Sequence, residues 1–194
     1  MAGRIIFLLE EPSMKDLLTR LIPRTIPGMV EHENFLCIPH QGKTDLERSI
    51  PRKLKGWKEP GVRFIVVEDN DSRICTEIKN RLKSIALEAG HPSAVVRLVC
   101  QELESWYLGD LKALAEAFDR EGLDTDAHRK RYADPDTWQK PSAEVERLIP
   151  GFQKRSGARL MGDRLGIHAN FSVSFNVFIS GMKRVASELG YSPT

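Results

Sequence analysis

The chain has 194 residues, and its 29 Lys and Arg against 27 Asp and Glu give a net charge of +2. This length suits one domain that can bury a core without disulfides or structural metal. The near balance of charge leaves the class of partner open, so any basic surface must be local.

The cysteine pattern and the lack of long apolar runs narrow the class of protein further. Cys37, Cys75 and Cys100 are far apart and form no CxxC arrangement, which excludes a zinc finger and fits a reducing cytoplasm. We expect Cys37 and Cys100 to be buried strand residues. No apolar run approaches about 18 residues, and the N-terminus has the pattern of a strand rather than of a signal peptide. The sequence therefore predicts a soluble, cytoplasmic protein that does not bind membranes.

Strands and helices alternate in the first half of the chain. Apolar runs predict strands at residues 4–9, 34–38, 62–67 and 94–100, and helical periodicity predicts helices at residues 14–21, 44–54 and 72–89. Ser13 is a candidate N-cap of the first helix, and Gly90 ends the third. This alternation implies right-handed crossovers and an α/β fold with a mostly parallel sheet of about four strands and helices on both faces.

From Glu102 onward the pattern becomes helical. Helices are expected at residues 103–118, 143–149, 151–165 and 174–189, with a polar linker over residues 122–141 as the most mobile stretch. We predict a single domain over residues 1–194, in which residues 1–120 form the α/β core and residues 121–194 a helical elaboration.

Two acidic clusters follow two of the predicted strands. Ile5–Leu9 runs into Glu10 and Glu11, and the strand at residues 62–67 runs into Glu68-Asp69-Asn70-Asp71. Parallel strands end at the same edge of a sheet, where ligands bind, so these acids should converge.

Convergence of the acids has an electrostatic consequence. Two carboxylates roughly 5 Å apart repel by about 3 kcal/mol at an effective dielectric near 20, and a hard divalent cation would relieve the repulsion. Oxygen ligands favour Mg²⁺ or Mn²⁺, which predicts a metal site at Asp69 and Asp71 with Glu10 as general acid or base. One of Glu11 and Glu68 should face solvent, and Ser72 could cap the next helix. The alternative is that acids at a strand end are merely solvated.

A third acidic segment begins where the fourth strand ends. Glu102 and Glu104 lie at the same expected edge and are candidates to ligate the metal or orient a ligand, while Leu103 and Trp106 pack in the core. The alternative is that these acids only favour a helix N-terminus through the macrodipole.

A candidate phosphate site follows the second strand. His40, Gly42, Lys43 and Thr44 lie at a predicted helix N-terminus beside the acids, where a phosphate would be stabilised. The P-loop motif is not met because its earlier glycine position holds Cys37. Basic runs occur elsewhere and are either a nucleic-acid track or ordinary solvated faces. They lie at residues 52–58, 128–131 and 154–164.

Three other chemistries can be compared with the sequence. A haloacid-dehalogenase-type phosphatase needs Thr or Val where Arg73 stands, and a two-component receiver needs Ser or Thr where the fourth strand ends in Val99-Cys100-Gln101. A glycosyltransferase of the DxD type stays open, although no sugar-nucleotide signature supports it.

The order of a glutamate after the first strand and an Asp-x-Asp after a later one resembles the Toprim domain of topoisomerases, bacterial primases and overcoming-lysogenization-defect nucleases. Four segments resemble more closely the Toprim-related domain of unknown function family 4276, relatives of RloB-like defence proteins. These segments are residues 9–13, 40–46, 69–72 and 102–110, and the likeness extends to Gln153-Lys154 and Ser174-Phe175.

The resemblance implies a Toprim/Rossmann-like fold in which Glu10 is the Toprim glutamate and Asp69 and Asp71 are its metal-binding pair. One departure is Glu11, which stands where the family usually has glycine. The resemblance also implies a partner protein, because the family is commonly accompanied by an ATPase that is encoded nearby.

Together these expectations predict a Mg²⁺- or Mn²⁺-dependent nuclease that cleaves phosphodiesters in nucleic acid, as a defence effector. The alternative is a non-catalytic metal- or nucleotide-binding subunit of an ATPase-containing complex.

Overall fold

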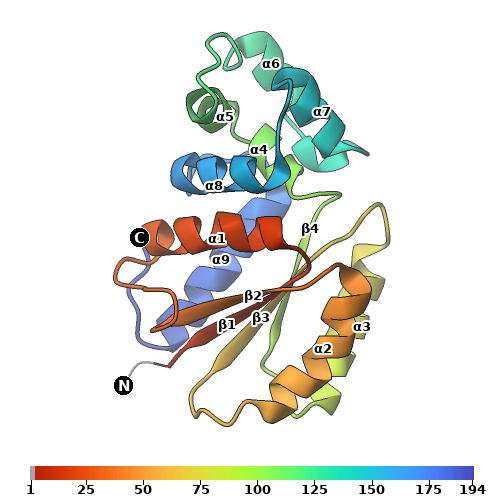
Figure 1. The fold of residues 1–194 in the computed structure, drawn as a ribbon, viewed down its shortest axis with the longest axis vertical. Coiled ribbons are helices and arrows are strands. Elements are labelled where there is room, and N and C mark those ends of the chain that lie inside the picture. Colours follow the sequence, from red (N-terminus) through yellow and green to blue (C-terminus); the bar gives the residue numbers. More distant parts are fainter. Residues whose placement is uncertain (1–2) are drawn as a thin grey trace.

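A computed structural model describes residues 3–194 of the chain, and its centre is one four-stranded sheet (Figure 1). The strands are β1 (Ile5–Leu9), β2 (Phe35–Pro39), β3 (Arg63–Asp69) and β4 (Val95–Val99). They lie in the order β2-β1-β3-β4, and every neighbouring pair is parallel. The predicted α/β fold with a parallel sheet is therefore confirmed.

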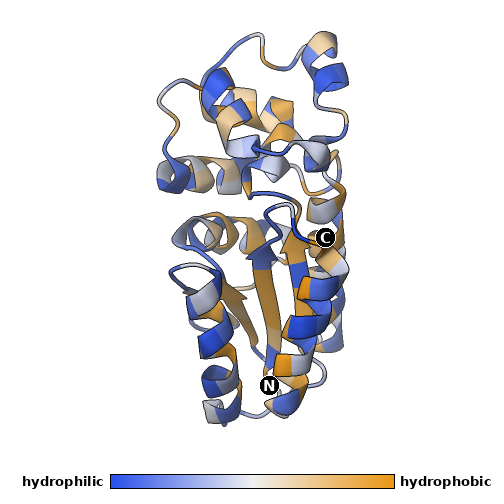
Figure 2. Cartoon of the chain, turned by 90° about the vertical axis from the view of Figure 1, so that its right-hand side faces the viewer, coloured by the Kyte–Doolittle hydropathy of each residue, from blue (hydrophilic) through white to orange (hydrophobic). Residues whose placement is uncertain are grey.

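The crossover helices α1 (Pro12–Thr25), α2 (Lys43–Gly56) and α3 (Cys75–Glu88) cover both faces of this sheet. Side chains alternate along a strand, so Ile5 and Phe7 of β1 face the cluster that includes α1, whereas Ile6 and Leu8 face α2 and α3. The strands are mostly apolar, with charged residues at both ends of β3 and Arg97 within β4, and the helices mix polar and apolar residues (Figure 2). Because both faces are covered, the strands read as continuous apolar runs.

The remaining helices lie beyond the carboxyl edge of the sheet or along its β4 side (Figure 1). They are α4 (Glu104–Leu108), α5 (Leu111–Ala117), α6 (Asp126–Arg131), the 3₁₀ helix η1 (Pro135–Thr137), α7 (Pro141–Leu148), α8 (Lys154–Arg164) and α9 (Val173–Glu188). One hydrophobic cluster runs without a break from β1 and α1 into these helices. Within residues 3–194, no helix is long and apolar enough to cross a membrane.

Helix α8 packs along α1, and this contact matters for the site. A Cβ at Gly162 would lie 2.7 Å from the carbonyl oxygen of Leu17, so the glycine allows the two helices to approach closely. Arg155 and Arg159 of α8 donate hydrogen bonds of 2.6 and 3.2 Å to the carboxylate of Asp16 on α1. Burial alone would raise the pKa of Asp16, but these hydrogen bonds lower it. The contact places the first residue of α8, Lys154, over the sheet edge.

Both predicted N-caps were wrong. Helix α1 begins at Pro12, so Glu11 is its N-cap and the Ser13 hydroxyl donates to the Glu11 carboxylate instead. Helix α3 begins only at Cys75, and Ser72 lies in the preceding loop, where its hydroxyl donates to Gln101 Oε1 at 2.8 Å. The loop between β3 and α3 is therefore longer than predicted.

The single helix expected over residues 103–118 is two helices. Gly109 and Asp110 interrupt it, because Asp110 caps α5 by accepting a hydrogen bond of 3.0 Å from Ala113 N. The Gly109 carbonyl accepts from Phe171 N at 2.9 Å. The predicted linker at residues 122–141 contains α6 and η1, and Cys100, expected to be buried within a strand, follows β4 and is partly exposed.

Candidate functional site

Two acidic side chains meet at the carboxyl ends of the central strands. Glu10 directly follows β1 and Asp69 is the last residue of β3. The Glu10 amide donates to the carbonyl oxygen of Val67 at 3.1 Å, and its carboxylate accepts from the Asp69 amide at 2.8 Å. Parallel pairing of β1 and β3 therefore brings Glu10 and Asp69 together as predicted.

Two further acids and one lysine complete what we call the acid cluster: Glu10, Glu11, Asp69, Glu104 and Lys154. Glu104 is the first residue of α4, and Lys154 is the first residue of α8. The ammonium of Lys154 lies 3.8 Å from Glu11 Oε2 and 3.9 Å from Glu104 Oε1. The lysine thus lies between the two glutamates.

Burial changes the protonation of these carboxylates. It raises the pKa of Glu10 to about 7 against the opposing effects of the Asp69 amide and Lys43. Burial also raises the pKa of Glu104 to about 7, with Lys154 opposing. The pKa of Asp69 is raised well above its usual range, first by burial and then by Glu10, Glu11 and Glu104. Burial lowers the pKa of Lys154, but Glu104 and Glu11 outweigh it, so this pKa is raised.

Some buried polar atoms in and beside the acid cluster have no hydrogen-bond partner. Within the described chain these include Asp69 Oδ1, Glu104 Oε2 and the hydroxyl of Tyr107, whose pKa is raised well above its usual range by burial and by Glu104. An unpaired buried oxygen costs about 1–3 kcal/mol, and more when it is charged. The cluster therefore keeps acceptors free that the fold itself does not satisfy.

Asp71 does not share the environment of Asp69. Asp69 is 6% exposed, whereas the Asp71 side chain is 48% exposed and forms an ion pair with Lys43. The backbone of Asp71 has a φ of 43° and lies in the left-handed region. The structure thus separates the predicted pair into a buried and an exposed carboxylate.

The other predicted acids have partners of their own. Glu68 is fully buried and pairs with Arg73 at 2.6 Å, so Glu11 is the more exposed of the two strand-end neighbours. Glu102 Oε2 accepts a hydrogen bond of 2.7 Å from Ser142 N at the start of α7, and this contact ties α7 to the sheet edge.

The predicted phosphate residues fall into two groups. His40 is buried, and its two ring nitrogens lie against the Leu9 carbonyl oxygen and the Ser49 hydroxyl, so its role is structural. Gly42 is the N-cap of α2 with a φ of 95°, a conformation that favours glycine, and its amide donates to the Glu10 carbonyl at 2.9 Å. Lys43 and the exposed Thr44 then occupy the first turn of α2. Lys43 is the cation of this group that faces the acids.

Comparison with known proteins identifies the family. The model of DUF4276, a domain of unknown function, matches residues 9–183. The chain belongs to the DUF4276 family. The sequence has no match among curated proteins.

Two solved structures share the fold of this DUF4276 protein. The C-terminal region of the Burkholderia pseudomallei OLD protein has a TM-score of 0.55 and 15% identity, covering 98% of this chain and 100% of that chain. The C-terminal region of the Xanthomonas campestris pv. campestris OLD protein has a TM-score of 0.55 and 12% identity, covering 96% of each chain. The likeness confirms a Toprim-like fold over nearly the whole chain.

The acid cluster of this DUF4276 protein fits a metal by donor chemistry rather than by a finished coordination shell. Its oxygens are the ligands that Mg²⁺ and Mn²⁺ prefer, and two of its buried carboxylate oxygens are unpaired. Across residues 3–194, however, no three His, Cys, Asp or Glu side chains are arranged so that together they could hold a metal ion. Lys43 and Lys154 neutralise acids of this edge in the structure.

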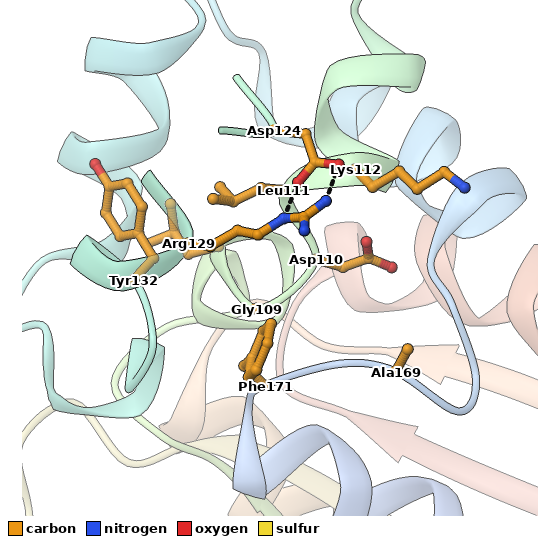
Figure 3. A pocket seen from close by; sticks show the side chains of 10 residues that line it. Gly109, Asp110, Leu111, Lys112, Asp124, Arg129, Tyr132, Ala169 and Phe171 are labelled. Atoms are coloured by element: carbon orange, nitrogen blue, oxygen red, sulfur yellow. Dashed lines mark hydrogen bonds and ion pairs between the residues drawn. The ribbon is translucent and has the colours of Figure 1, made fainter. Parts of the chain in front are cut away.

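A separate cavity of about 250 Å³ lies among the C-terminal helices (Figure 3). The side chains of Leu111, Tyr132 and Phe171 contribute to its wall, and Arg129 crosses it with two hydrogen bonds of 2.7 Å to Asp124. None of the five members of the acid cluster lines this cavity. The acids therefore do not open into the enclosed space of the helical layer.

Sequence reasoning missed two members of the site. Lys154 was named only in a basic run and in the family resemblance, and Tyr107 only in the resembling segment 102–110, so neither was predicted to contact the acids. The periodicity of α4 could have indicated Tyr107, since residues 104 and 107 lie on the same face of a helix. No local signal indicates that Lys154 lies over Glu104.

Proposed function

We propose that this protein is a Mg²⁺- or Mn²⁺-dependent nuclease that cleaves phosphodiester bonds in nucleic acid. The observation that carries the proposal is the buried acid cluster, with unpaired oxygens at Asp69 and Glu104 and a raised pKa at three carboxylates. Perturbed carboxylates gathered at one sheet edge are typical of functional sites. The shared fold with the OLD C-terminal regions supports the same proposal.

The buried carboxylates would hold the cation. Asp69 and Glu104 supply the unpaired oxygens, and Asp71 becomes a further ligand when Lys43 releases it. A bound divalent cation would polarise the phosphoryl oxygens and stabilise the leaving oxygen. Glu102, held by Ser142, orients the loop that leads to Glu104.

Glu10 would handle the proton. A pKa of about 7 lets its carboxyl group exist in both protonation states near neutral pH, which suits a general acid or base. One oxygen of Glu10 is held by the Asp69 amide at 2.8 Å, and this hydrogen bond fixes the orientation of the carboxylate.

Lys43 and Lys154 would contact the phosphate. Each already contacts an acid of the edge; Lys43 is partly exposed and Lys154 is exposed. A phosphate that binds with a cation would give these ammonium groups an anionic partner when the acids turn to the metal. Gly42 and Thr44 would add the N-terminal turn of α2 to this phosphate site.

Purified protein incubated with supercoiled plasmid or structured RNA, with Mn²⁺ or with EDTA, tests the proposal. We expect cleavage that needs Mn²⁺ and is lost in Asp69→Asn and Glu104→Gln. Metal-independent cleavage, or wild-type rates in both variants, would refute the proposed role of the acid cluster.

Two observations favour a second candidate, a non-catalytic metal- or nucleotide-binding subunit of a complex with an ATPase. The lysines already neutralise the acids, and the described residues contain no finished metal shell. This candidate predicts that the protein alone binds Mn²⁺ and cleaves neither DNA nor RNA. Any activity of the complex would then require the ATPase subunit.

A further inference from the structure

The cavity among the C-terminal helices begins where α4 ends. Its volume is about 250 Å³, and the side chains of Leu111, Tyr132 and Phe171 and the backbone of Gly109 lie around it (Figure 3). Cavities for drug-sized ligands occupy roughly 300–1,000 Å³, and an apolar cavity of about 150 Å³ holds benzene. The volume therefore suits one small, flat ring system.

Phe171 forms an open wall of this cavity. Its side chain is 57% exposed, which is unusual for a large aromatic residue at a cavity. The loop that carries it is nevertheless held at both ends, because the Phe171 amide donates to the Gly109 carbonyl at 2.9 Å and the Gly166 amide donates to Asp110 Oδ2 at 2.7 Å. The ring is thus fixed in place by its backbone and is free to stack with the ring of a ligand.

Tyr132 forms a buried wall. It is 1% exposed, its hydroxyl donates to Glu144 Oε2 of α7 at 2.8 Å, and its ring centre lies 5.3 Å from that of Trp138. Because α7 holds the hydroxyl, the ring is the part of Tyr132 that the cavity can use. The wall is therefore apolar and already in position.

The polar part of the lining has no net charge. Arg129 and Lys112 are balanced by Asp110 and Asp124, and Arg129 donates two hydrogen bonds of 2.7 Å to Asp124. A guanidinium group has five N–H donors, so Arg129 can also donate to a ligand, while the Asp124 carboxylate can accept. Apolar walls with a donor and an acceptor at one side fit a neutral ring that carries acceptors and donors on its edge, which describes a nucleobase.

Outside the cavity, α6 presents a basic surface with aromatic neighbours. The helix carries Arg129, Lys130 and Arg131 and one acid, Asp126. The Arg131 guanidinium lies 5.0 Å from the ring centre of Trp138, and Glu144 pairs with it at 3.4 Å. The sequence alone showed no aromatic residues among these cations; tertiary packing supplies them. Cations combined with aromatic rings are typical of surfaces that bind single strands.

We propose that this cavity binds one unpaired base of a nucleic-acid strand, so that single-stranded or bulged nucleic acid is the substrate class. The base would stack on Phe171, pack against Tyr132 and bond through its edge to Arg129. The contribution to cleavage rests on the proposed function. Glu104 and Gly109 flank the ends of α4, whose five residues rise roughly 7 Å, so a strand held in the cavity would bring a neighbouring phosphodiester to the acid cluster.

The test uses 2-aminopurine, a fluorescent adenine analogue whose emission falls when it stacks, as a single unpaired bulge in a short DNA or RNA duplex. Titrations in Ca²⁺ should show saturable quenching by the wild type and by Val173→Ala, an exposed apolar control outside the cavity. Phe171→Ala should bind at least about fivefold more weakly through loss of one stacked ring. Phe171→Tyr keeps the ring and should bind as the wild type does. Equal quenching and affinity in the wild type and Phe171→Ala would overturn the proposal.

A second arm distinguishes a strand from a free nucleotide. The monophosphate of 2-aminopurine riboside should bind at least about tenfold more weakly than the bulged duplex, because the duplex also offers its backbone to the cations of α6. Equal affinity for the mononucleotide would assign the cavity to free nucleotides and overturn the strand as its occupant.

A third arm separates this inference from the proposed function. In Mn²⁺, Phe171→Ala should raise the KM for the bulged substrate and leave kcat nearly unchanged, because Phe171 lies outside the acid cluster. If the wild type quenches the bulged base in Ca²⁺ but cleaves nothing in Mn²⁺, the proposed function fails and the base site stands. If the wild type cleaves and Phe171→Ala has the same KM and affinity, the base site fails and the proposed function stands.

Discussion

Glu104 shows at the scale of one residue how burial creates a candidate site. It is 1% exposed, and its Oε2 has no hydrogen-bond partner. Its Oε1 lies 3.9 Å from the ammonium of Lys154. A glutamate with no function would rarely persist in such a place, because the burial of a charge is expensive unless the charge is paired. The buried carboxylate of Glu104 therefore indicates a site that binds a cation or a proton.

The raised pKa values of Glu10 and Glu104 predict how stability depends on pH. Both are about 7 in the folded protein, above the ordinary 4.5, so the folded state binds more protons than the unfolded state between these values. Their contribution is fully present below pH 4.5 and is lost as the pH rises through about 7. In metal-free buffer we expect the free energy of unfolding to fall over this window.

Urea unfolding of Glu104→Gln across this window tests the pH prediction. Gln keeps the shape of the side chain and cannot ionise, so the decline should be shallower, with a gain of roughly 1 kcal/mol over the wild type at pH 8. Saturating Mn²⁺ should also flatten the wild-type curve. A slope identical in the wild type and the variant would show that Glu104 does not titrate in this range.

Lys43→Ala tests the phosphate contact. Lys43 pairs with Asp71 on an exposed surface, so its removal should change the melting temperature little. Binding of a fluorescent nucleic acid in the presence of Ca²⁺, which takes oxygen ligands as Mg²⁺ does, should weaken by roughly 1–3 kcal/mol at low salt, as for a hydrogen bond to a charged group. Lys83→Ala, an exposed lysine of α3 that lies outside the predicted basic runs, is the matched control. Equal affinity in both variants would place Lys43 outside the binding surface.

At the scale of secondary structure, the elements that could be predicted are those whose signal is local. The four strands were evident because each contains an apolar run, fully buried in β1 and partly buried in the edge strands β2 and β4, and the acids at the ends of β1 and β3 marked their carboxyl ends. The start of α1 was predicted too late, with Ser13 as its N-cap. The helix begins at Pro12, because proline is favoured at the first position of a helix. The break was missed although Gly109 followed by the capping Asp110 is a local signal for it, and Phe171, far along the chain, adds a hydrogen bond to the Gly109 carbonyl.

The packing of α8 on α1 gives a prediction at this scale. Gly162→Ala places a Cβ 2.7 Å from the Leu17 carbonyl, so the helices must separate. Overpacking costs about 1–3 kcal/mol and exceeds the gain of up to about 1 kcal/mol from the better helix former. We expect a net loss of roughly 1 kcal/mol in urea. Gly56→Ala, where a Cβ meets nothing within 4 Å, is the control and should be neutral or stabilising.

At the scale of the whole molecule, the sheet edge and the C-terminal helices build one site together. The strands position Glu10 and Asp69, α4 contributes Glu104, and α8 brings Lys154, which lies more than half the chain after Glu10. Sequence spacing could indicate the first pair, because parallel strands must end together. It could not indicate the lysine, whose place depends on how α8 docks on α1.

Calorimetric titration of Mn²⁺ into the reduced wild type, Asp69→Asn and a Glu116→Gln control tests the central claim most directly. Glu116 is an exposed acid of α5 whose one ion pair is to Lys112 at 4.0 Å. We predict saturable binding to the wild type and the control, and binding at least about tenfold weaker in Asp69→Asn, a loss of roughly 1.4 kcal/mol. The variant should also melt at a higher temperature in metal-free buffer, because like-charge repulsion is removed. Equal Mn²⁺ affinity in all three proteins, or none in the wild type, would contradict the account.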